Sequence, residues 1–291
     1  MSNFKILADS CCDIPDDILN KIDVDIIPYY TCIDSKNHLR ERLDITIDEF
    51  YSQLNLNKNL FPKTSFPPLY EFEKFFRSYL DKNLDILFIS MTEKFSSAFQ
   101  ALNNMVENLE DEYPNLNIIL VDSMQVSMGE GLLIIEAAKM KKAGYSIFEI
   151  ADFINKSKYD SKLFCTVNSL DYLQKGGRIG KVSAIAGSLL NIKPIISMKN
   201  GELFPYSKVH GRKKAVEELI NLIAKATQNQ KNDYEFALMH SSQDDEVNEI
   251  INTLKNKFDI SLALPPVKVG SIIGSHIGPT VLALTAVKKF S

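Results

Sequence analysis

The sequence is poor in the features that mark several classes of protein. Its 291 residues include only four cysteines, and the adjacent Cys11 and Cys12 fit neither a CxxC redox pair nor a zinc knuckle, so we expect reduced thiols. No run of about 18 apolar residues is present, and the first residues lack the basic start and apolar core of a signal peptide. We therefore expect a cytoplasmic protein without a membrane-spanning helix.

Sequence signatures of common enzyme classes are also missing. There is no G-x-S-x-G elbow, no G-x-x-x-x-G-K-[ST] phosphate loop, and no HExxH or CxxC spacing for a metal. The three glycines of the segment 270–278 lack both the lysine of a phosphate loop and the Rossmann spacing. We expect no catalytic residue, no metal and no cofactor, although the serine, aspartate and histidine residues leave a hydrolase open as an alternative.

The charge of the chain is weakly negative but unevenly distributed. A net charge of −4 argues against nucleic acid as a partner. The segment 175–214 nevertheless holds nine lysines and arginines against one acid, whereas the first 60 residues hold eleven acids against six bases. A basic face for an anionic partner and an ordinary solvated charge run both fit this stretch.

Short apolar runs alternate with helical patterns in the first half of the chain. The predicted strands are 4–8, 85–90 and 117–121, and the predicted helices are 96–109, 126–143 and 147–155. The helix over 126–143 is apolar on a wide face, which predicts burial on more than one side. The segment 31–66 is less regular and predicts an excursion over the surface with a helical stretch at 47–54. Such alternation is typical of a parallel sheet, so residues 1–157 predict an α/β domain.

The second half of the chain has a different order of predicted strands and helices. The predicted strands are 162–167, 193–198, 203–208, 235–240 and 263–269, and the predicted helices are 169–175, 182–190, 212–227, 246–258 and 280–289. Asn200-Gly201 between two of the strands is a strong hairpin signal, because both positions tolerate positive φ. Residues 158–291 therefore predict an α+β domain with a mixed or antiparallel sheet, and the boundary falls near Lys158.

Several polar clusters follow one another along the chain, mostly where predicted strands end or helices begin. They are Asp9-Ser10, Thr64-Ser65 before two prolines, Ser96-Ser97, Asp122-Ser123, Lys175-Gly176-Gly177-Arg178-Ile179 and His276-Ile277-Gly278-Pro279. Taken singly, each has an ordinary structural role. Thr64-Ser65 fits a turn before proline, Ser96 a helix N-cap, and Gly176-Gly177 a helix stop.

In this order, however, the clusters resemble the DegV family of bacterial proteins, and the resemblance runs from Asp9 to Pro279. It implies a ligand tunnel between the two domains that holds one long-chain fatty acid. Some family members are the acyl-carrying subunit of a bacterial fatty acid kinase. There a separate, dihydroxyacetone-kinase-like subunit phosphorylates the carboxylate and so feeds phospholipid synthesis. A carrier of a different lipid acid stays open, and so does a transient membrane contact.

The resemblance also assigns roles to residues. It implies that the fatty-acid carboxylate is bound by Thr64, Ser65, Ser96, Ser97 and His276. It implies that the kinase subunit docks at Arg178, Lys208 and Arg212 of the basic stretch. The chain departs from the usual family pattern at Ser97, Phe99, His210 and Thr280. Hydroxyl groups and an imidazole suit this task, because each can donate to a carboxylate without a fixed charge.

Overall fold

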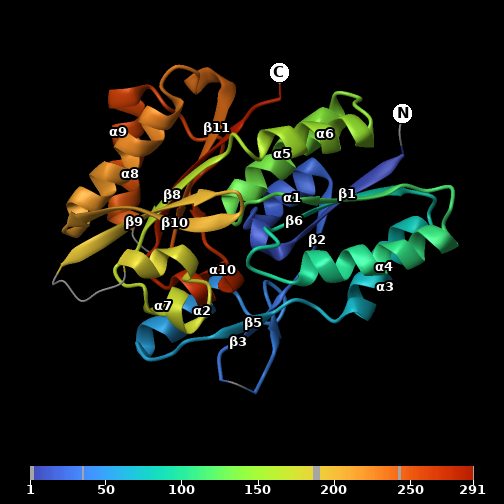
Figure 1. Ribbon diagram of the computed structural model, residues 1–291, viewed down its shortest axis with the longest axis horizontal. Coiled ribbons are helices and arrows are strands. Elements are labelled where there is room, and N and C mark those ends of the chain that lie inside the picture. Colours follow the sequence, from blue (N-terminus) through green and yellow to red (C-terminus); the bar gives the residue numbers. More distant parts are fainter. Residues whose placement is uncertain (1–2, 35, 186–190, 242–243, 291) are drawn as a thin grey trace.

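The computed structural model describes residues 3–34, 36–185, 191–241 and 244–290 (Figure 1). Within these ranges the first half forms a parallel sheet with the strand order β2-β1-β6-β7. Its strands are β1 (Phe4–Asp9), β2 (Val24–Ile27), β6 (Asp85–Ser90) and β7 (Ile118–Asp122). The parallel sheet predicted from the alternation of strands and helices is thus confirmed.

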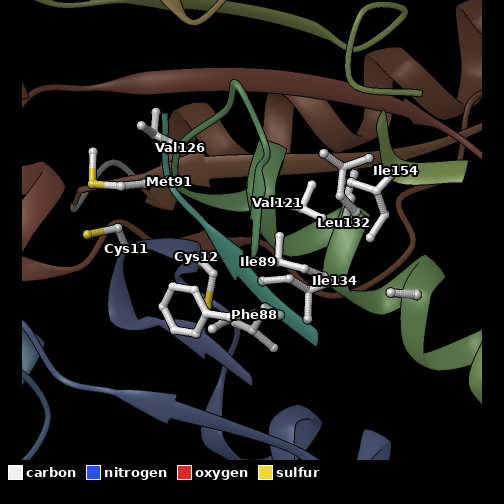
Figure 2. Packing of buried hydrophobic residues seen from close by; sticks show 14 of the residues in the cluster. Cys11, Cys12, Phe88, Ile89, Met91, Val121, Val126, Leu132, Ile134 and Ile154 are labelled. Atoms are coloured by element: carbon white, nitrogen blue, oxygen red, sulfur yellow. The ribbon is translucent and has the colours of Figure 1, made fainter. Parts of the chain in front are cut away.

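Helices cover both faces of this sheet. They are α1 (Asp16–Ile22), α3 (Leu69–Leu80), α4 (Ala98–Glu112), α5 (Met128–Lys142) and α6 (Ile147–Ser157), and a 3₁₀ turn, η1 (Ser10–Cys12), follows β1. In Figure 1, α3 and α4 lie on one side and α5 and α6 on the other. Leu132 and Ile134 of α5 pack near Ile89 and Val121 of the sheet, as Figure 2 shows.

The second half forms a six-stranded mixed sheet with the order β10-β9-β8-β13-β11-β12. Its strands are β8 (Lys162–Thr166), β9 (Ile192–Lys199), β10 (Glu202–His210), β11 (Tyr234–His240), β12 (Val267–Lys268) and β13 (Leu282–Lys288). Neighbours are antiparallel except β11 and β12. The predicted hairpin at Asn200-Gly201 joins β9 to β10, and both residues have positive φ. The mixed sheet is therefore confirmed.

The helices of the second half are α7 (Asp171–Lys175), α8 (Arg212–Thr227), α9 (Asp244–Phe258) and α10 (Ser271–Ile277), with 3₁₀ segments η2 (Gly180–Ile185) and η3 (Lys231–Asp233). Helix α8 packs on β8, β9 and β13, whereas α5 from the first half packs on β11 and β13. Helix α5 thus lies between the two sheets, which explains why it is buried nearly all round. One core spans both halves, and the division at Lys158 stays a prediction.

Three predictions for the second half were wrong in whole or in part. The predicted helix 280–289 is strand β13, which pairs with β8 and β11 and is buried on both faces, so its apolar residues carry no period. The predicted strand 263–269 shrinks to β12, because Pro265 and Pro266 cannot donate to a ladder. The predicted helix 182–190 begins as the 3₁₀ segment η2, and residues 186–190 lie outside the described residues.

The segment 31–66 is more ordered than the predicted surface excursion. Three short strands, β3 (Tyr30–Cys32), β4 (Leu39–Arg40) and β5 (Lys63–Ser65), form a sheet of the order β4-β3-β5. Helix α2 (Ile47–Leu56) starts with a capping box between Thr46 and Glu49. A threonine three residues before a glutamate is the sequence pattern that favours this cap. The small sheet places Thr64 opposite Thr31, whose buried hydroxyl lies 3.2 Å from that of Ser275.

Two buried carboxylates from the first half hold the start of helix α10. Asp13 Oδ1 accepts a hydrogen bond from the backbone N–H of Gly270 at 3.0 Å, and Glu41 Oε1 accepts from that of Ile272 at 3.1 Å. Carboxyl oxygens at a helix N-terminus satisfy N–H groups that have no partner inside the helix. Burial, and then the charge of Glu41, raise the pKa of Asp13 to about 8. These contacts fix α10, which carries His276, against the first half of the chain.

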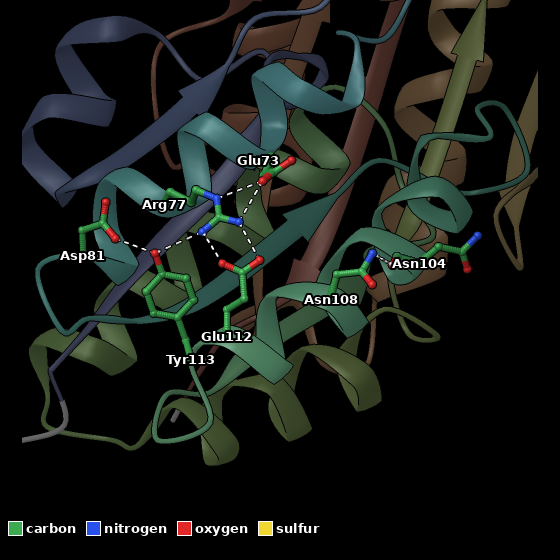
Figure 3. A network of polar contacts seen from close by, with 7 residues as sticks. All are labelled: Glu73, Arg77, Asp81, Asn104, Asn108, Glu112 and Tyr113. Carbon is green, nitrogen blue, oxygen red and sulfur yellow. Dashed lines mark hydrogen bonds and ion pairs between the residues drawn. The ribbon is translucent and has the colours of Figure 1, made fainter.

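A polar network joins α3 to α4, the helices that follow the loops of Thr64 and Ser96. Arg77 of α3 donates to Glu73 at 2.9 Å and to Glu112 of α4 at 2.8 Å, as Figure 3 shows. Tyr113 accepts from Arg77 and donates to Asp81. Exposed pairs of this kind contribute little to stability, so the network orients the two helices more than it stabilises them.

Candidate functional site

A cavity of about 270 Å³ lies between the two halves of the chain. Most of its wall is apolar and comes from both sides, with Met91 and Val126 from the first half and Leu163, Met239 and Ala283 from the strands of the second. Helix α10 lines the cavity along its length with Ile272, Ile273, His276 and Ile277. An apolar space of this kind suits an apolar ligand of small cross-section.

All five side chains expected at the carboxylate line this cavity: Thr64, Ser65, Ser96, Ser97 and His276. Thr64 and Ser65 come from β5, Ser96 and Ser97 from the turn between β6 and α4, and His276 from α10. Thus three segments far apart in the sequence converge on one cavity. Whether these side chains hold a carboxylate stays a prediction.

Thr64 and His276 are in direct contact. Thr64 Oγ1 lies 2.7 Å from His276 Nε2, although the two residues are 212 positions apart in the sequence. The other ring nitrogen, Nδ1, is buried and has no hydrogen-bond partner among the described residues. A Cβ atom on Gly176 would lie 2.3 Å from this Nδ1, so Gly176 leaves room for the imidazole. The helix stop predicted at Gly176-Gly177 therefore also serves the site.

The imidazole of His276 is held neutral. Burial, and then the nearby positive charge of Arg178, lower the pKa of His276 to about 4. A neutral ring carries one N–H, and that proton belongs on Nε2 if the ring donates to Thr64. The hydroxyl hydrogen of Thr64 is then free to point toward a third group in the cavity.

Ser96 and Ser97 stand just before helix α4, which begins at Ala98 rather than at Ser96 as predicted. Ser96 Oγ accepts from the backbone N–H of Ala98 at 3.2 Å and is half-buried, whereas Ser97 is more exposed and makes no side-chain cap. The first N–H groups of a helix lack partners inside it and favour an anion. The hydroxyl hydrogen of Ser96 is available to the same space.

The three basic residues predicted as a docking surface are placed differently. Arg178 lines the cavity and donates to the backbone carbonyl groups of Phe95 and Gly176. Lys208 is exposed on β10, and Arg212 at the start of α8 pairs with Glu246 at 2.9 Å. Lys208 and Arg212 do not belong to the cavity wall.

Sequence reasoning missed several residues of the wall. Tyr29, Ser127 and Cys165 line the cavity, and Ser127 Oγ donates to Asp13 at 2.5 Å. Ser127 follows Asp122-Ser123 at the carboxyl edge of the parallel sheet, where ligands are expected. Burial raises the pKa of the Cys165 thiol to about 12, and all four cysteines are free and buried, as expected for reduced thiols.

The described residues add two further observations on the site. No group of three or more His, Cys, Asp or Glu side chains in this part of the chain is arranged to hold a metal ion. None of the helices of the described ranges has the length and apolar character that crossing a bilayer requires.

A parallel sheet and a mixed sheet that flank an apolar cavity with hydroxyl and imidazole groups define a class of two-sheet α/β proteins. The chain belongs to the DegV family, whose model, described as an uncharacterised protein family, matches residues 3–289.

Proteins of similar sequence and structure support this assignment. The crystal structure of a stearic-acid-binding protein from Eubacterium ventriosum has a TM-score of 0.93 and 30% identity, over 98% of both chains. A fatty-acid-binding DegV family protein from Thermus thermophilus has a TM-score of 0.87 and 25% identity, over 98% of this chain and 99% of that one. A fatty acid-binding protein of Thermotoga maritima is 31% identical over 94% of both chains.

Proposed function

We propose that this chain binds one long-chain fatty acid in the cavity, with its carboxylate held by Ser96 and by Thr64, which His276 orients, and flanked by Ser65 and Ser97. The observation that carries the proposal is the contact of Thr64 with His276 at 2.7 Å in the wall of a largely apolar cavity. The relatives that are named for fatty-acid or stearic-acid binding support it.

The energetics suit such a ligand. An acyl chain of about 15 methylenes gains on the order of 12 kcal/mol gross when it leaves water, at roughly 0.8 kcal/mol per methylene. Lost freedom of the chain and of the protein offsets much of this gain. A carboxylate without partners in such a place would cost several kcal/mol, so donors must stand where the head group lies. The hydroxyl groups of Thr64 and Ser96 meet this need.

Removal of one donor at a time tests the proposal. Thr64→Val keeps the shape of the side chain and Ser96→Ala removes a single oxygen, so each should weaken binding of palmitate by about 10-fold or more, since a hydrogen bond to a charged group is worth about 1.5–3 kcal/mol. The measurement is a dissociation constant from titration of delipidated protein. Thr253→Val on α9, remote from the cavity, serves as the control. Unchanged affinity in both site variants would count decisively against the proposal.

We further propose that the chain presents the carboxylate to a separate kinase subunit, in the cytoplasm, and is itself not catalytic. A carboxylate oxygen would attack the terminal phosphorus of a nucleoside triphosphate, the bond to the diphosphate would break, and an acyl phosphate would form. Docking at the basic stretch would involve Arg178, Lys208 and Arg212, of which Lys208 is the most exposed. A transient membrane contact would let the chain load and unload the acid.

This finer proposal is tested by mixing the loaded protein with ATP and the fatty acid kinase subunit of the same organism, and trapping acyl phosphate with hydroxylamine. We expect hydroxamate only when both proteins are present, and less of it with Lys208→Glu. Hydroxamate from this chain alone would show that the chain is an enzyme.

A hydrolase that uses Ser96 and His276 is the alternative from a different class. A serine hydrolase needs the nucleophile and the base within hydrogen-bond reach. Here His276 Nε2 contacts Thr64, Ser96 Oγ accepts from Ala98, and a pKa of about 4 makes His276 a weak base. These contacts favour carriage over hydrolysis. Carriage of a different lipid acid fits the same cavity and would show itself in the identity of the copurified ligand.

A further inference from the structure

Arg178 carries a fixed charge inside the wall of the cavity. Among the described residues that line the cavity, the others are apolar, hydroxyl-bearing or sulfur-bearing side chains and the neutral His276. The guanidinium is close enough to His276 to act on its ionisation. An arginine stays charged in any environment of a protein, so this wall has a permanent positive charge at the end where Thr64 and His276 meet.

The guanidinium is tied to two backbone carbonyl groups. Arg178 Nε and Nη2 both donate to the carbonyl oxygen of Phe95, at 3.1 and 3.0 Å, and Nη1 donates to that of Gly176 at 2.7 Å. Phe95 directly precedes Ser96, and Gly176 packs against the ring of His276. One side chain therefore connects the loop that carries Ser96 with the segment of Gly176, which packs against the ring of His276.

The loop of Ser96 is held by the second half of the chain at its other end as well. Thr92 Oγ1 donates to the carbonyl oxygen of Gly201 at the tip of the β9–β10 hairpin, at 3.0 Å. A Cβ on Gly201 would lie 2.4 Å from that hydroxyl, and Gly201 has φ of +78°, so the close approach requires glycine. The second half of the chain thus holds this loop at two points. Of these two contacts, that of Arg178 with Phe95 is the nearer to Ser96 in the sequence.

We infer that Arg178 is a positioning residue of the head-group site: it holds the Ser96 loop through Phe95 and places a positive charge beside the ligand carboxylate. This inference rests on the proposed function and extends it. Three of the five guanidinium N–H groups donate to backbone carbonyls, and these bonds fix the position of the guanidinium in the wall. It stabilises the ionised acid by its charge and leaves the contacts to neutral donors.

The ionisation of the bound ligand tests this role directly. Palmitate labelled with ¹³C at its carboxyl carbon is bound to the protein, and its chemical shift is followed by NMR as the pH is changed. We expect the carboxyl group to be ionised at neutral pH in the wild-type protein, and Arg178→Gln to raise its pKa by about one unit or more, because a nearby opposite charge lowers the pKa of a carboxyl group by about 1–3 units. Arg178→Lys should fall between the two.

Lys175→Gln is the matched control, since it removes the same charge from the exposed face of the neighbouring helix α7 and should leave the titration unchanged. If bound palmitate titrates in Arg178→Gln as it does in the wild-type protein, the inference is overturned. Palmitate that is protonated at neutral pH in the wild-type protein would also overturn it, and this second measurement does not depend on the folding of any variant. A wild-type protein with no signal from bound palmitate would instead refute the proposed function.

Discussion

At the scale of residues, the site combines groups that a sequence pattern can locate with groups that only the fold brings near. The ordered motifs predicted Thr64, Ser96 and His276, and all three line one cavity. The contacts of Gly176 with His276 and of Arg178 with Phe95 were not predictable, because a helix stop and a basic residue look alike in a sequence whether they face solvent or a ligand. Their distances from His276 and Phe95 come from the path of the chain in space.

His276 makes stability depend on pH. Its pKa is about 4 in the folded protein, below the ordinary value of 6.5, so the unfolded chain binds more protons between these two values. The contribution of His276 is therefore fully present above about pH 6.5 and is lost as the pH falls toward 4.

We expect His276→Gln to flatten the fall in the free energy of unfolding between pH 6.5 and pH 4. Urea unfolding of the wild-type protein and of His276→Gln, at several pH values in this window, measures how the free energy of unfolding depends on pH. His38→Gln, on an exposed surface, is the control and should keep the wild-type slope. A slope for His276→Gln as steep as that of the wild-type protein would show that the imidazole is not held neutral.

At the scale of elements, the sequence pattern predicted the parallel sheet well and the last strand wrongly. Strands β1, β6 and β7 are short apolar runs between helices, and this alternation has one common structural solution. Strand β13 is equally apolar but lies between β8 and β11 with both faces buried, so it shows neither the period of a helix nor that of a half-exposed strand. Only pairing partners far away in the sequence decide its structure.

Helix α10 depends on acids that no local pattern connects with it. Asp13 accepts from Gly270 and Ser127, with Glu41 beside it. The pKa of Asp13 is raised to about 8 from 3.8, so the folded protein binds more protons than the unfolded chain in this range. The corresponding stability is present below about pH 4 and is lost as the pH rises through about 8.

We expect Asp13→Asn to reduce the loss of thermal stability between pH 6 and pH 9, because the amide stays neutral where the carboxyl group ionises. Differential scanning calorimetry at the two pH values measures the change in melting temperature. Asp17→Asn, an exposed position on α1, is the control. If Asp13→Asn loses as much between the two pH values as the wild-type protein does, Asp13 is already ionised at pH 6.

At the scale of the whole molecule, the cavity wall is shared by the two halves of the chain. Residues of the first half, such as Tyr29, Met91 and Val126, face residues of the second, such as Leu163 and Met239, across one space. A ligand there contacts both halves and binds only the folded state. Binding must therefore stabilise the two halves together.

Saturation with palmitate should raise the melting temperature of delipidated protein. Ligand at about 100 times its dissociation constant adds about 2.7 kcal/mol to the free energy of unfolding. For a chain of this size we expect a rise of roughly 5 °C. Scanning fluorimetry with and without palmitate measures it, and Thr64→Val should show a smaller rise at the same concentration. A ligand that leaves the melting temperature unchanged does not occupy this cavity.

Native mass spectrometry of freshly purified protein tests the central claim most directly. We expect one bound molecule per chain, released on denaturation and identified as a long-chain fatty acid, and a strong loss of this species in the Thr64→Val Ser96→Ala double variant. A protein that carries no lipid and takes up none from added palmitate would contradict the claim.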